Sequence, residues 1–545
     1  MMKIYEALAK VFHTLDLGTC FALLGDANMH WAGALSDLGA RFIYTRHEYA
    51  AVAAATAYAR NTGKVGFATV TCGPGLTQVM TILPIAARAR VPLVLFAGEA
   101  PLHKEWYNQM IDQAPFVQAC GAQYVPLHDP DTIIQDVINA VQHAAMERIP
   151  VVLGVPFDLQ KQDFTGDISR LKATFEFPKL DDVSPNHDAI QSVAARLQNT
   201  EKTVILAGMG ATSDNAQKLI VELAEVTGSL LATTLPAKGL FHDQAFSLGV
   251  AGGYASDAAK SIFERAEVVL GIGARMASHT FDGGRLTPNA QVIQLDLEPQ
   301  EQVQGRKASD IQITADAISG TQALLTACTG NPAKTWRTTA MLAETAAALT
   351  LPQFTRPTDG FLHPLAVIET LLQEIPKAAH VINTSGHCAY YTAQMNAHPQ
   401  SHYTVIRDFG AIGNGTSFAL GIAERYPDRP VILLDGDGSV MMHIQELETM
   451  ARHGLNIMTI VLNDGGYGSE VHKLRASGAT LAGSVFGRPD FASVGRGFGL
   501  MGTTATTKDD IAQAIRAFLN SDGPAICDVH ISDTIASPQI QRIKH

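Results

Sequence analysis

Two apolar runs between residues 430 and 468 each end in a glycine-rich turn that carries an aspartate. The first run, 431–434, is long enough for one buried strand. It leads into Gly-Asp-Gly at 436–438, where glycine permits a tight turn that other residues avoid. The second run, 457–462, ends in Asn-Asp-Gly-Gly at 463–466. The pattern predicts two strands of a parallel sheet, each followed by a polar turn.

Apolar residues between these runs recur at helical spacing from 440 to 451, and Gly454 follows as a stop signal, which predicts one helix. In a parallel sheet, ligands bind beyond the carboxyl ends of the strands, where backbone N–H groups of helix starts can bind a phosphate. Asp437 and Asp464 supply the hard oxygen ligands that Mg²⁺ takes beside phosphate oxygens. The stretch therefore predicts a diphosphate held through a metal. Two ordinary turns without a ligand are the alternative.

Strands and helices alternate along the rest of the chain, which is typical of parallel sheets with helices on both faces. At 545 residues, of which 46% are apolar, the chain is long enough for about three domains with large cores. We expect these domains at 1–165, 187–328 and 360–545. Polar and proline-containing stretches at 161–186 and 329–359 are predicted to be linkers.

Charge, cysteine content and hydropathy exclude several functional classes. The net charge of −12 argues against a nucleic-acid-binding surface. The six cysteines are scattered without a Cys-x-x-Cys pair, which argues against a disulfide framework or a zinc site and fits a reducing cytosol. Residues 1–16 predict an amphipathic helix rather than a signal peptide, and no apolar run reaches the length of a membrane span. We expect a cytoplasmic protein with no nucleic-acid or membrane partner.

A further acidic residue, Glu48, opens a run of small residues. Arg46-His47-Glu48 precedes an alanine-rich segment, 49–60, which predicts a buried helix packed closely against other elements or a second subunit. A carboxylate at a helix start is often only a favourable partner for the helix dipole. A glutamate that enters a buried region, however, needs a specific partner, because burial disfavours its charged form. Glu48 is therefore a candidate functional residue.

These motifs together resemble the thiamine-diphosphate-dependent acetohydroxyacid synthase and 2-oxo-acid decarboxylase superfamily. The two aspartate turns are similar to its cofactor-binding motif, with Asn463-Asp464 where a pair of asparagines is usual. Arg46-His47-Glu48 and Thr-Cys-Gly-Pro-Gly at 71–75 are similar to its pyrimidine-binding domain, with Cys72 in place of a serine. The resemblance covers nearly the whole chain. It implies an α/β fold of three doubly wound parallel-sheet domains, in the order pyrimidine-binding, central and diphosphate-binding.

The resemblance also implies roles for individual residues. Glu48 is expected to contact N1′ of the cofactor's aminopyrimidine ring and to be the catalytic residue. The expected metal ligands are Asp437, Asp464 and the backbone carbonyl of Gly466. Cofactor contacts are expected at Gly386, His387, Ile412, Gly436, Asp437, Gly438, Ser439, Asp464, Tyr467 and Gly468. Candidate substrate contacts are Gln109, His443 and His472.

The reaction that the resemblance implies is acetolactate synthase-like and uses thiamine diphosphate and Mg²⁺ on a 2-oxo acid or a related carbonyl substrate. In the family carbon dioxide leaves and an enamine remains, which is either protonated or ligated to a second carbonyl. The family arrangement also implies a homodimer or homotetramer. In it, Glu48 of one chain serves the cofactor held by Asp437 and Asp464 of another.

Three other functions stay open. True acetohydroxyacid synthases carry a tryptophan-bearing segment after the second aspartate turn, whereas Trp31, Trp106 and Trp336 of this chain all lie earlier. A simple 2-oxo-acid decarboxylase, similar to benzoylformate decarboxylase and releasing an aldehyde, is therefore one alternative. Another is a flavin-binding oxidase built on Gly-Met-Gly-Ala at 208–211, because some relatives bind FAD in the central domain. The last is a catalytically silent homologue.

Overall fold

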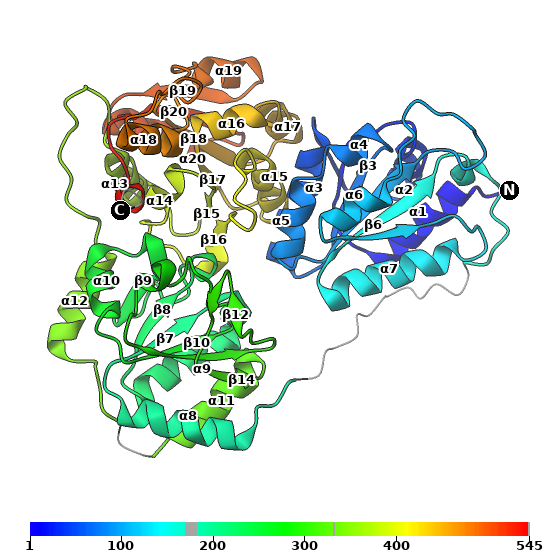
Figure 1. Ribbon diagram of the computed structural model, residues 1–545. Helices are drawn as coiled ribbons and strands as arrows, with labels where there is room; N and C mark the ends of the chain where they lie inside the picture. Colours follow the sequence, from blue (N-terminus) through cyan, green and yellow to red (C-terminus); the bar gives the residue numbers. More distant parts are fainter. Residues whose placement is uncertain (169–181, 331–332, 543–545) are drawn as a thin grey trace.

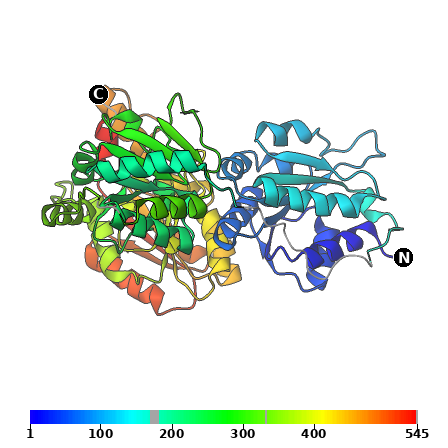
Figure 2. The same cartoon turned by 90° about the horizontal axis from the view of Figure 1, so that it is seen from below.

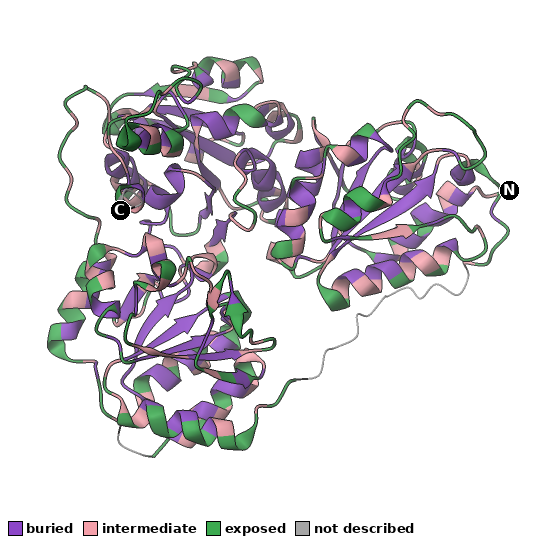
Figure 3. Cartoon of the chain, viewed as in Figure 1, coloured by how far each residue is buried: buried purple, intermediate pink, exposed green. Residues whose placement is uncertain are grey.

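The computed structural model describes residues 1–168, 182–330 and 333–542 of the chain. Within these ranges three six-stranded parallel sheets follow one another along the sequence (Figure 1). Each sheet has a hydrophobic cluster on both faces, so its strands form the buried interior of a domain (Figure 3). The predicted fold class, three doubly wound α/β domains, is confirmed.

The first domain has the strand order β2-β1-β3-β4-β6-β5. Its strands are β1 (Cys20–Ala22), β2 (Phe42–Tyr44), β3 (Gly66–Val70), β4 (Leu93–Glu99), β5 (Gln123–Pro126) and β6 (Pro150–Pro156). Its helices are α1 (Ile4–Leu15), α2 (Met29–Asp37), α3 (Glu48–Thr62), α4 (Pro74–Thr77), α5 (Ile82–Arg88), α6 (Ala114–Ala119), α7 (Ile133–Glu147) and the 3-10 turn η1 (Leu159–Lys161). Part of the predicted linker at 161–186, residues 169–181, lies outside the described residues.

The central domain has the strand order β14-β11-β10-β7-β8-β9. Its strands are β7 (Thr203–Ala207), β8 (Leu230–Thr233), β9 (Ser247–Val250), β10 (Val268–Ile272), β11 (Gln291–Asp296), β14 (Ile311–Thr314) and the small antiparallel pair β12 (Gln302–Val303) and β13 (Arg306–Lys307). Its helices are α8 (His187–Asn199), α9 (Asp214–Val226), α10 (Asp257–Phe263) and α11 (Ala317–Cys328). Four 3-10 turns lie among these elements: η2 (Met209–Ala211), η3 (Leu235–Ala237), η4 (Gly252–Tyr254) and η5 (Asp282–Gly284).

The predicted linker at 329–359 is wrong in part, because it contains a helix, α12 (Thr339–Leu349). Met341, Thr345 and Ala348 are buried at helical spacing, and the helix packs on α10 and β9 of the central domain. The prolines that suggested a linker flank this helix and do not interrupt it. The central domain therefore continues beyond residue 328.

The third domain has the strand order β16-β15-β17-β18-β20-β19. Its strands are β15 (His380–Asn383), β16 (Tyr403–Val405), β17 (Val431–Gly436), β18 (Ile457–Asn463), β19 (Met501–Ala505) and β20 (Ala525–His530). Its helices are α13 (Pro364–Glu374), α14 (Cys388–Thr392), α15 (Gly415–Arg425), α16 (Asp437–Met442), α17 (Glu446–His453), α18 (Gly468–Ser477), α19 (Phe491–Gly497), α20 (Lys508–Leu519) and α21 (Pro538–Arg542).

The single helix predicted between the two aspartate turns is also wrong, because α16 and α17 are separate helices. His443 ends α16 with φ −133° and ψ 40°, outside the helical region. Its Nδ1 lies 2.5 Å from the carbonyl oxygen of Gly413, in the loop before α15. The apolar spacing of the sequence continues across residue 443, but this contact with a residue distant in the sequence accompanies the end of the helix there.

The first and third domains pack through α3 and α15, which lie side by side in Figures 1 and 2. A Cβ atom at Gly421 of α15 would lie 2.0 Å from the carbonyl oxygen of Ala54 of α3, so the two backbones meet only because Gly421 has none. The close packing predicted for the small-residue helix is therefore made within the chain. No helix in the described ranges is long and apolar enough to cross a membrane.

Candidate active site

The main pocket lies at the carboxyl ends of β15, β17 and β18 and has an empty volume of about 480 Å³, part of it continuous with solvent. Three segments line it, within 385–388, 436–439 and 464–470, together with Tyr391, Ile412, Leu462 and Ile531. All the residues predicted to contact the cofactor lie on its wall: Gly386, His387, Ile412, Gly436, Asp437, Gly438, Ser439, Asp464, Tyr467 and Gly468. Gly466, the third predicted metal ligand, lies there as well. The structure thus brings these residues together, and their roles toward a cofactor stay predictions.

Asp437 joins the two turns of the pocket. Its Oδ1 accepts the backbone N–H of Gly438 at 2.7 Å, and its Oδ2 accepts the N–H groups of Gly465 at 2.7 Å and Gly466 at 3.2 Å. The side chain is almost fully buried. These bonds fix the carboxylate at the position where β17 and β18 end next to each other.

Asp437 and Asp464 form a buried acidic pair. Burial raises the pKa of Asp437, and repulsion from Asp464 raises it further; burial raises the pKa of Asp464 as well. The imidazole of His387 lies near the pair, with Nδ1 3.9 Å from Oδ2 of Asp464, but burial lowers its pKa to about 4 and so keeps it neutral. The positive charge of Arg488 lowers the pKa of Asp464, but burial outweighs this effect. Among the described residues, no lysine or arginine forms an ion pair with either carboxylate.

This donor set fits Mg²⁺ bound together with a diphosphate. The described residues contain no cluster of three or more His, Cys, Asp or Glu that could hold a metal alone. Mg²⁺, however, is usually held by one or two carboxylates plus phosphate oxygens. A Cβ atom at Gly468 would lie 2.4 Å from Oδ2 of Asp464 and 3.0 Å from Nδ1 of His387, so glycine keeps the space beside the acid open.

A further acid, Asp435, supports the pocket from beneath and was missed from the sequence. Its Oδ1 accepts a hydrogen bond from Thr384 and its Oδ2 accepts one from Ser439, both at 2.8 Å. Ser439 in turn accepts the N–H of Gly413 at 2.8 Å. Burial raises the pKa of Asp435 to about 7. The available signal was an aspartate at the end of an apolar run, directly before the Gly-Asp-Gly turn.

Glu48 begins α3 but does not line the pocket, and no residue of the first domain does. Its side chain is 16% exposed, and Oε2 lies 4.0 Å from Nδ1 of His47. The neighbours of Glu48 do reach the third domain: Tyr49 stacks on His443 with ring centroids 4.5 Å apart, and His47 meets the same ring edge-on at 5.2 Å. The helix start is therefore fixed near the pocket without Glu48 lining it.

Each of the three domains matches a known protein family. Residues 2–116 match the thiamine pyrophosphate enzyme N-terminal TPP binding domain, 190–324 the central domain and 384–529 the C-terminal TPP binding domain. The chain belongs to the thiamine pyrophosphate enzymes. Thiamine pyrophosphate is thiamine diphosphate, so the predicted family and cofactor agree with these matches.

The curated relatives of this thiamine pyrophosphate enzyme include acetolactate synthases. The acetolactate synthase isozyme 2 large subunit of Escherichia coli is 27% identical over 538 residues, which covers 96% of this chain and 95% of the relative. The acetolactate synthase large subunit of Parasynechococcus marenigrum is 27% identical over 96% of this chain and 87% of its own. The probable acetolactate synthase large subunit of Methanocaldococcus jannaschii is 26% identical over 99% and 93%. The chain is thus an acetolactate synthase-like enzyme that acts as a carboligase or a decarboxylase.

The three candidate substrate contacts of the enzyme lie in different places. His472 is buried, and its ring lies 4.8 Å from that of His387 on the pocket wall. His443 lies between the domains, as described above. Gln109 lies in the first domain, where its Oε1 accepts a hydrogen bond from Sγ of Cys72 at 3.3 Å. Only His472 is therefore next to a residue of the pocket, and all three roles stay predictions.

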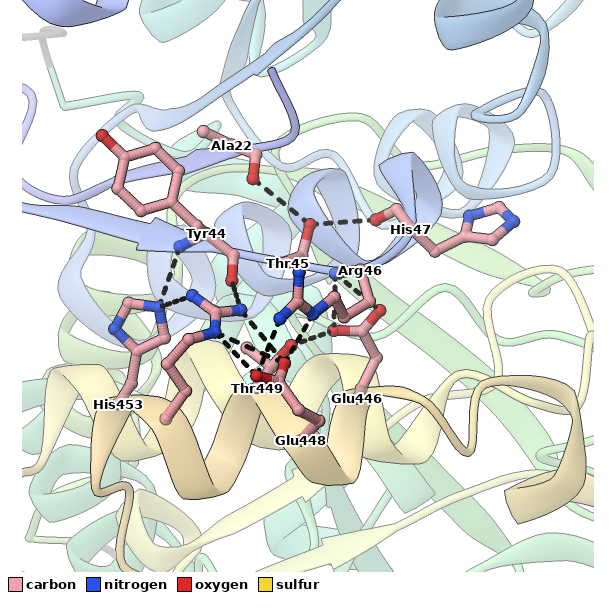
Figure 4. Close-up of polar contacts among 10 residues, drawn as sticks. Ala22, Tyr44, Thr45, Arg46, His47, Glu446, Glu448, Thr449 and His453 are labelled. Atoms are coloured by element: carbon pink, nitrogen blue, oxygen red, sulfur yellow. Dashed lines mark hydrogen bonds and ion pairs between the residues drawn. The ribbon is translucent and has the colours of Figure 1, made fainter. Parts of the chain in front are cut away.

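The loop before Glu48 is held against α17 of the third domain (Figure 4). Both carboxylate oxygens of Glu446 accept the backbone N–H of Arg46, at 3.2 and 3.3 Å, and Oε2 also accepts the hydroxyl of Thr449 at 2.8 Å. The Arg46 side chain donates two hydrogen bonds to Glu448, at 2.6 and 2.8 Å. Residues of α17 therefore hold the chain two residues before Glu48, the predicted catalytic residue.

Replacing Glu446 by glutamine should reduce the pH dependence of folding stability. Burial raises the pKa of Glu446 to about 7, against the opposing effects of Thr449, Arg46 and Arg452. Because this pKa is higher than in the unfolded chain, the folded state favours the protonated form of Glu446. The stability that this preference contributes is fully present below about pH 4.5 and is lost as the pH rises through about 7. The loss is on the order of 1–3 kcal/mol. Thermal denaturation should show that stability falls less with rising pH in Glu446→Gln than in the wild type.

Glu448→Gln is the matched control for this experiment. The hydrogen bonds from Arg46, more than any other contact, lower the pKa of Glu448 to about 2, with Arg452 adding to the effect. Glu448 therefore stays ionised from about pH 5 to about pH 8, and its loss should lower the denaturation midpoint similarly across that window. The same pH slope in Glu446→Gln and wild type would contradict the prediction.

Proposed function

We propose that this enzyme uses thiamine diphosphate and Mg²⁺ to decarboxylate a 2-oxo acid, to ligate its acyl part to a second carbonyl compound, or both. The observation that carries the proposal is the buried pair Asp437 and Asp464 in one pocket, with which no lysine or arginine of the described residues forms an ion pair. The relatives named acetolactate synthases support the substrate class. The six cysteines are free thiols, which supports a cytoplasmic location.

Different residues of the pocket would bind the metal, the diphosphate and the rings of the cofactor. Asp437, Asp464 and the backbone carbonyl of Gly466 would hold Mg²⁺, and backbone N–H groups of the surrounding loops would bind the diphosphate. Ile412 would support the rings with an apolar side chain. The bound cofactor supplies the electron sink for the carbonyl carbon.

Glu48 would hold a proton at N1′ of the aminopyrimidine ring. Since no first-domain residue lines the pocket of its own chain, we propose that Glu48 comes from a partner subunit, in a homodimer or homotetramer. The fixed contacts of Tyr49 and His47 with His443 support a helix start that is held rigidly enough for this task.

A simple 2-oxo-acid decarboxylase that releases an aldehyde is the second candidate. Tyr467 and Phe486, whose rings lie 5.3 Å apart, are both partly exposed at the pocket turn, and no tryptophan follows them in the sequence. An aromatic pair of this kind, with Tyr467 on the pocket wall, would favour a bulky apolar substrate. It does not match the tryptophan-bearing segment expected for an acetohydroxyacid synthase.

We propose that the central domain does not use FAD for catalysis. Backbone N–H groups of the Gly-Met-Gly-Ala turn at 208–211 already have partners within the domain. Gly208 donates its N–H to the carbonyl oxygen of Ile272 at 2.9 Å, and Gly210 donates its N–H to the carbonyl oxygen of Gly273 at 3.0 Å. These N–H groups are the ones that a dinucleotide pyrophosphate would need. Because these N–H groups are occupied, the turn disfavours a flavin-binding oxidase. The presence of both Asp437 and Asp464 in the pocket disfavours a catalytically silent homologue.

A panel of 2-oxo acids tests the proposed function. Purified enzyme is incubated with pyruvate, 2-oxobutyrate and benzoylformate, with and without thiamine diphosphate and Mg²⁺, and carbon dioxide and organic products are measured. We expect carbon dioxide release from at least one acid that depends on both additions, with an aldehyde or a ligated hydroxy ketone as the product. No turnover of any acid, or turnover that ignores both additions, would contradict the proposal.

A further inference from the structure

Arg407 lies just beyond the carboxyl end of β16, in the loop that leads to the pocket residue Ile412. It follows Ile406, whose carbonyl oxygen accepts a hydrogen bond from the hydroxyl of Ser385 at 3.0 Å. Ser385 lines the pocket, and Ile412, five residues after Arg407, lines it as well. Arg407 therefore belongs to the loop that connects edge strand β16 with the pocket wall.

The guanidinium of Arg407 stacks on an aromatic ring of the central domain. Its Cζ lies 4.8 Å from the centre of the Tyr254 ring, which in turn stacks on Tyr390 with centroids 6.1 Å apart. Tyr391, the next residue, lines the pocket. The stack thus connects Arg407, through Tyr254 and Tyr390, to the neighbour of a residue on the pocket wall.

The positive charge of Arg407 has no anionic partner among residues 1–168, 182–330 and 333–542. Its Nη1 is buried without a hydrogen-bond partner in that part of the chain. The adjacent acid, Asp408, is directed to Arg60, with 3.2 Å between Oδ2 and Nη1. Burial lowers the pKa of Arg407 to about 10, so the group stays charged near neutral pH. A buried charge without a partner is costly, and a bound anion would remove that cost.

We propose that Arg407 is a specificity-determining residue that binds the carboxylate of the 2-oxo acid substrate. This inference rests on the proposed function and narrows its substrate class to carbonyl compounds that carry a negative charge. A guanidinium presents a planar fork that matches a carboxylate, and stacking on Tyr254 holds that plane in one orientation. Because the ion pair is made with the intact substrate, Arg407 should act mainly on KM and much less on kcat.

The test compares charged and neutral forms of one substrate in wild-type and Arg407→Gln holoenzyme. The probes are pyruvate with pyruvamide and benzoylformate with benzoylformamide, because each amide keeps the carbonyl group and the shape but has no charge. We expect Arg407→Gln to weaken binding of the acids about 10- to 100-fold, the range for a lost hydrogen bond to a charged group. Binding of the amides and of thiamine diphosphate should stay as in the wild type.

Arg429 offers a matched control. It stacks on Tyr426 at 4.2 Å in the same domain but precedes β17, at the opposite edge of the sheet. Arg429→Gln should bind acids and amides as the wild type does. Arg407→Lys keeps the charge but not the planar fork, so it should recover part of the preference for acids over amides. This variant keeps the test decisive if Arg407→Gln does not fold.

The outcomes separate this inference from the proposed function. Equal affinity of Arg407→Gln and wild type for the acids, or a wild type that binds acids no better than amides, would overturn the inference. Equal weakening of acids, amides and thiamine diphosphate in Arg407→Gln and Arg407→Lys would show a structural role instead and also overturn it. Failure of the proposed function is a different result, namely that the wild type converts no 2-oxo acid, and it is read from turnover rather than from binding.

Discussion

Replacing Asp437 by asparagine should lower the affinity for thiamine diphosphate in the presence of Mg²⁺ by at least about 100-fold, the upper end of the loss found for residues that only support metal ligands. The carboxylate accepts three backbone N–H groups and faces Asp464. An asparagine keeps one acceptor oxygen but turns an NH₂ group toward these donors or the metal. Isothermal titration calorimetry measures the affinity, and circular dichroism checks that the variant is folded.

Asp509→Asn is the control for this variant. Asp509 lies exposed in the first turn of α20, away from the pocket, so its replacement removes the same charge without touching the site. Cofactor affinity in Asp509→Asn should equal that of the wild type. If Asp437→Asn also bound the cofactor with wild-type affinity, Asp437 would not be a metal ligand.

Replacing Glu48 by glutamine should leave cofactor binding mostly intact and slow its activation about a hundredfold to ten-thousandfold, the usual cost of losing a positioned acid–base group. Glutamine keeps the size of the side chain and can still form a hydrogen bond with N1′, but it cannot share a proton there. Hydrogen–deuterium exchange at C2 of the bound cofactor, followed by NMR after rapid quenching, measures the activation.

Another role of Glu48 predicts a different result in the same experiment. If Glu48 only complements the dipole of α3, Glu48→Gln should cost roughly 0.3–1 kcal/mol of stability and leave exchange nearly normal. Glu6→Gln in the first turn of α1 is a suitable control, since that acid also begins a helix of the first domain and caps its backbone. Wild-type exchange rates in Glu48→Gln would show that Glu48 does not activate the cofactor.

The residues of the pocket could be predicted because they sit in local patterns. Asp437 and Asp464 each follow an apolar strand, and parallel strands end at one edge of a sheet, so the sequence alone implies that the two acids lie close together. The same reasoning applies to Gly386 and His387, which follow β15. The three sheets were predictable for a similar reason, since their alternating helices and strands are encoded by short-range periodicity.

Features that depend on contacts between distant residues could not be predicted. The break at His443 depends on the carbonyl of Gly413, and nothing in the periodicity between 440 and 451 marks it. Glu446 looks like a surface residue of an amphipathic helix until the loop of Arg46 is packed on it. Arg407 is an ordinary charged loop residue in the sequence, and its significance comes from burial beside Tyr254.

We predict that one pocket holds the cofactor through a metal and that a second chain completes the site. A crystal structure of the enzyme grown with thiamine diphosphate and Mg²⁺ tests both parts directly. We expect the metal at about 2.0–2.1 Å from oxygens of Asp437 and Asp464 and from the carbonyl of Gly466, with Glu48 of the partner subunit in contact with N1′. A diphosphate bound away from these two aspartates, or a complete site without a partner subunit, would contradict it.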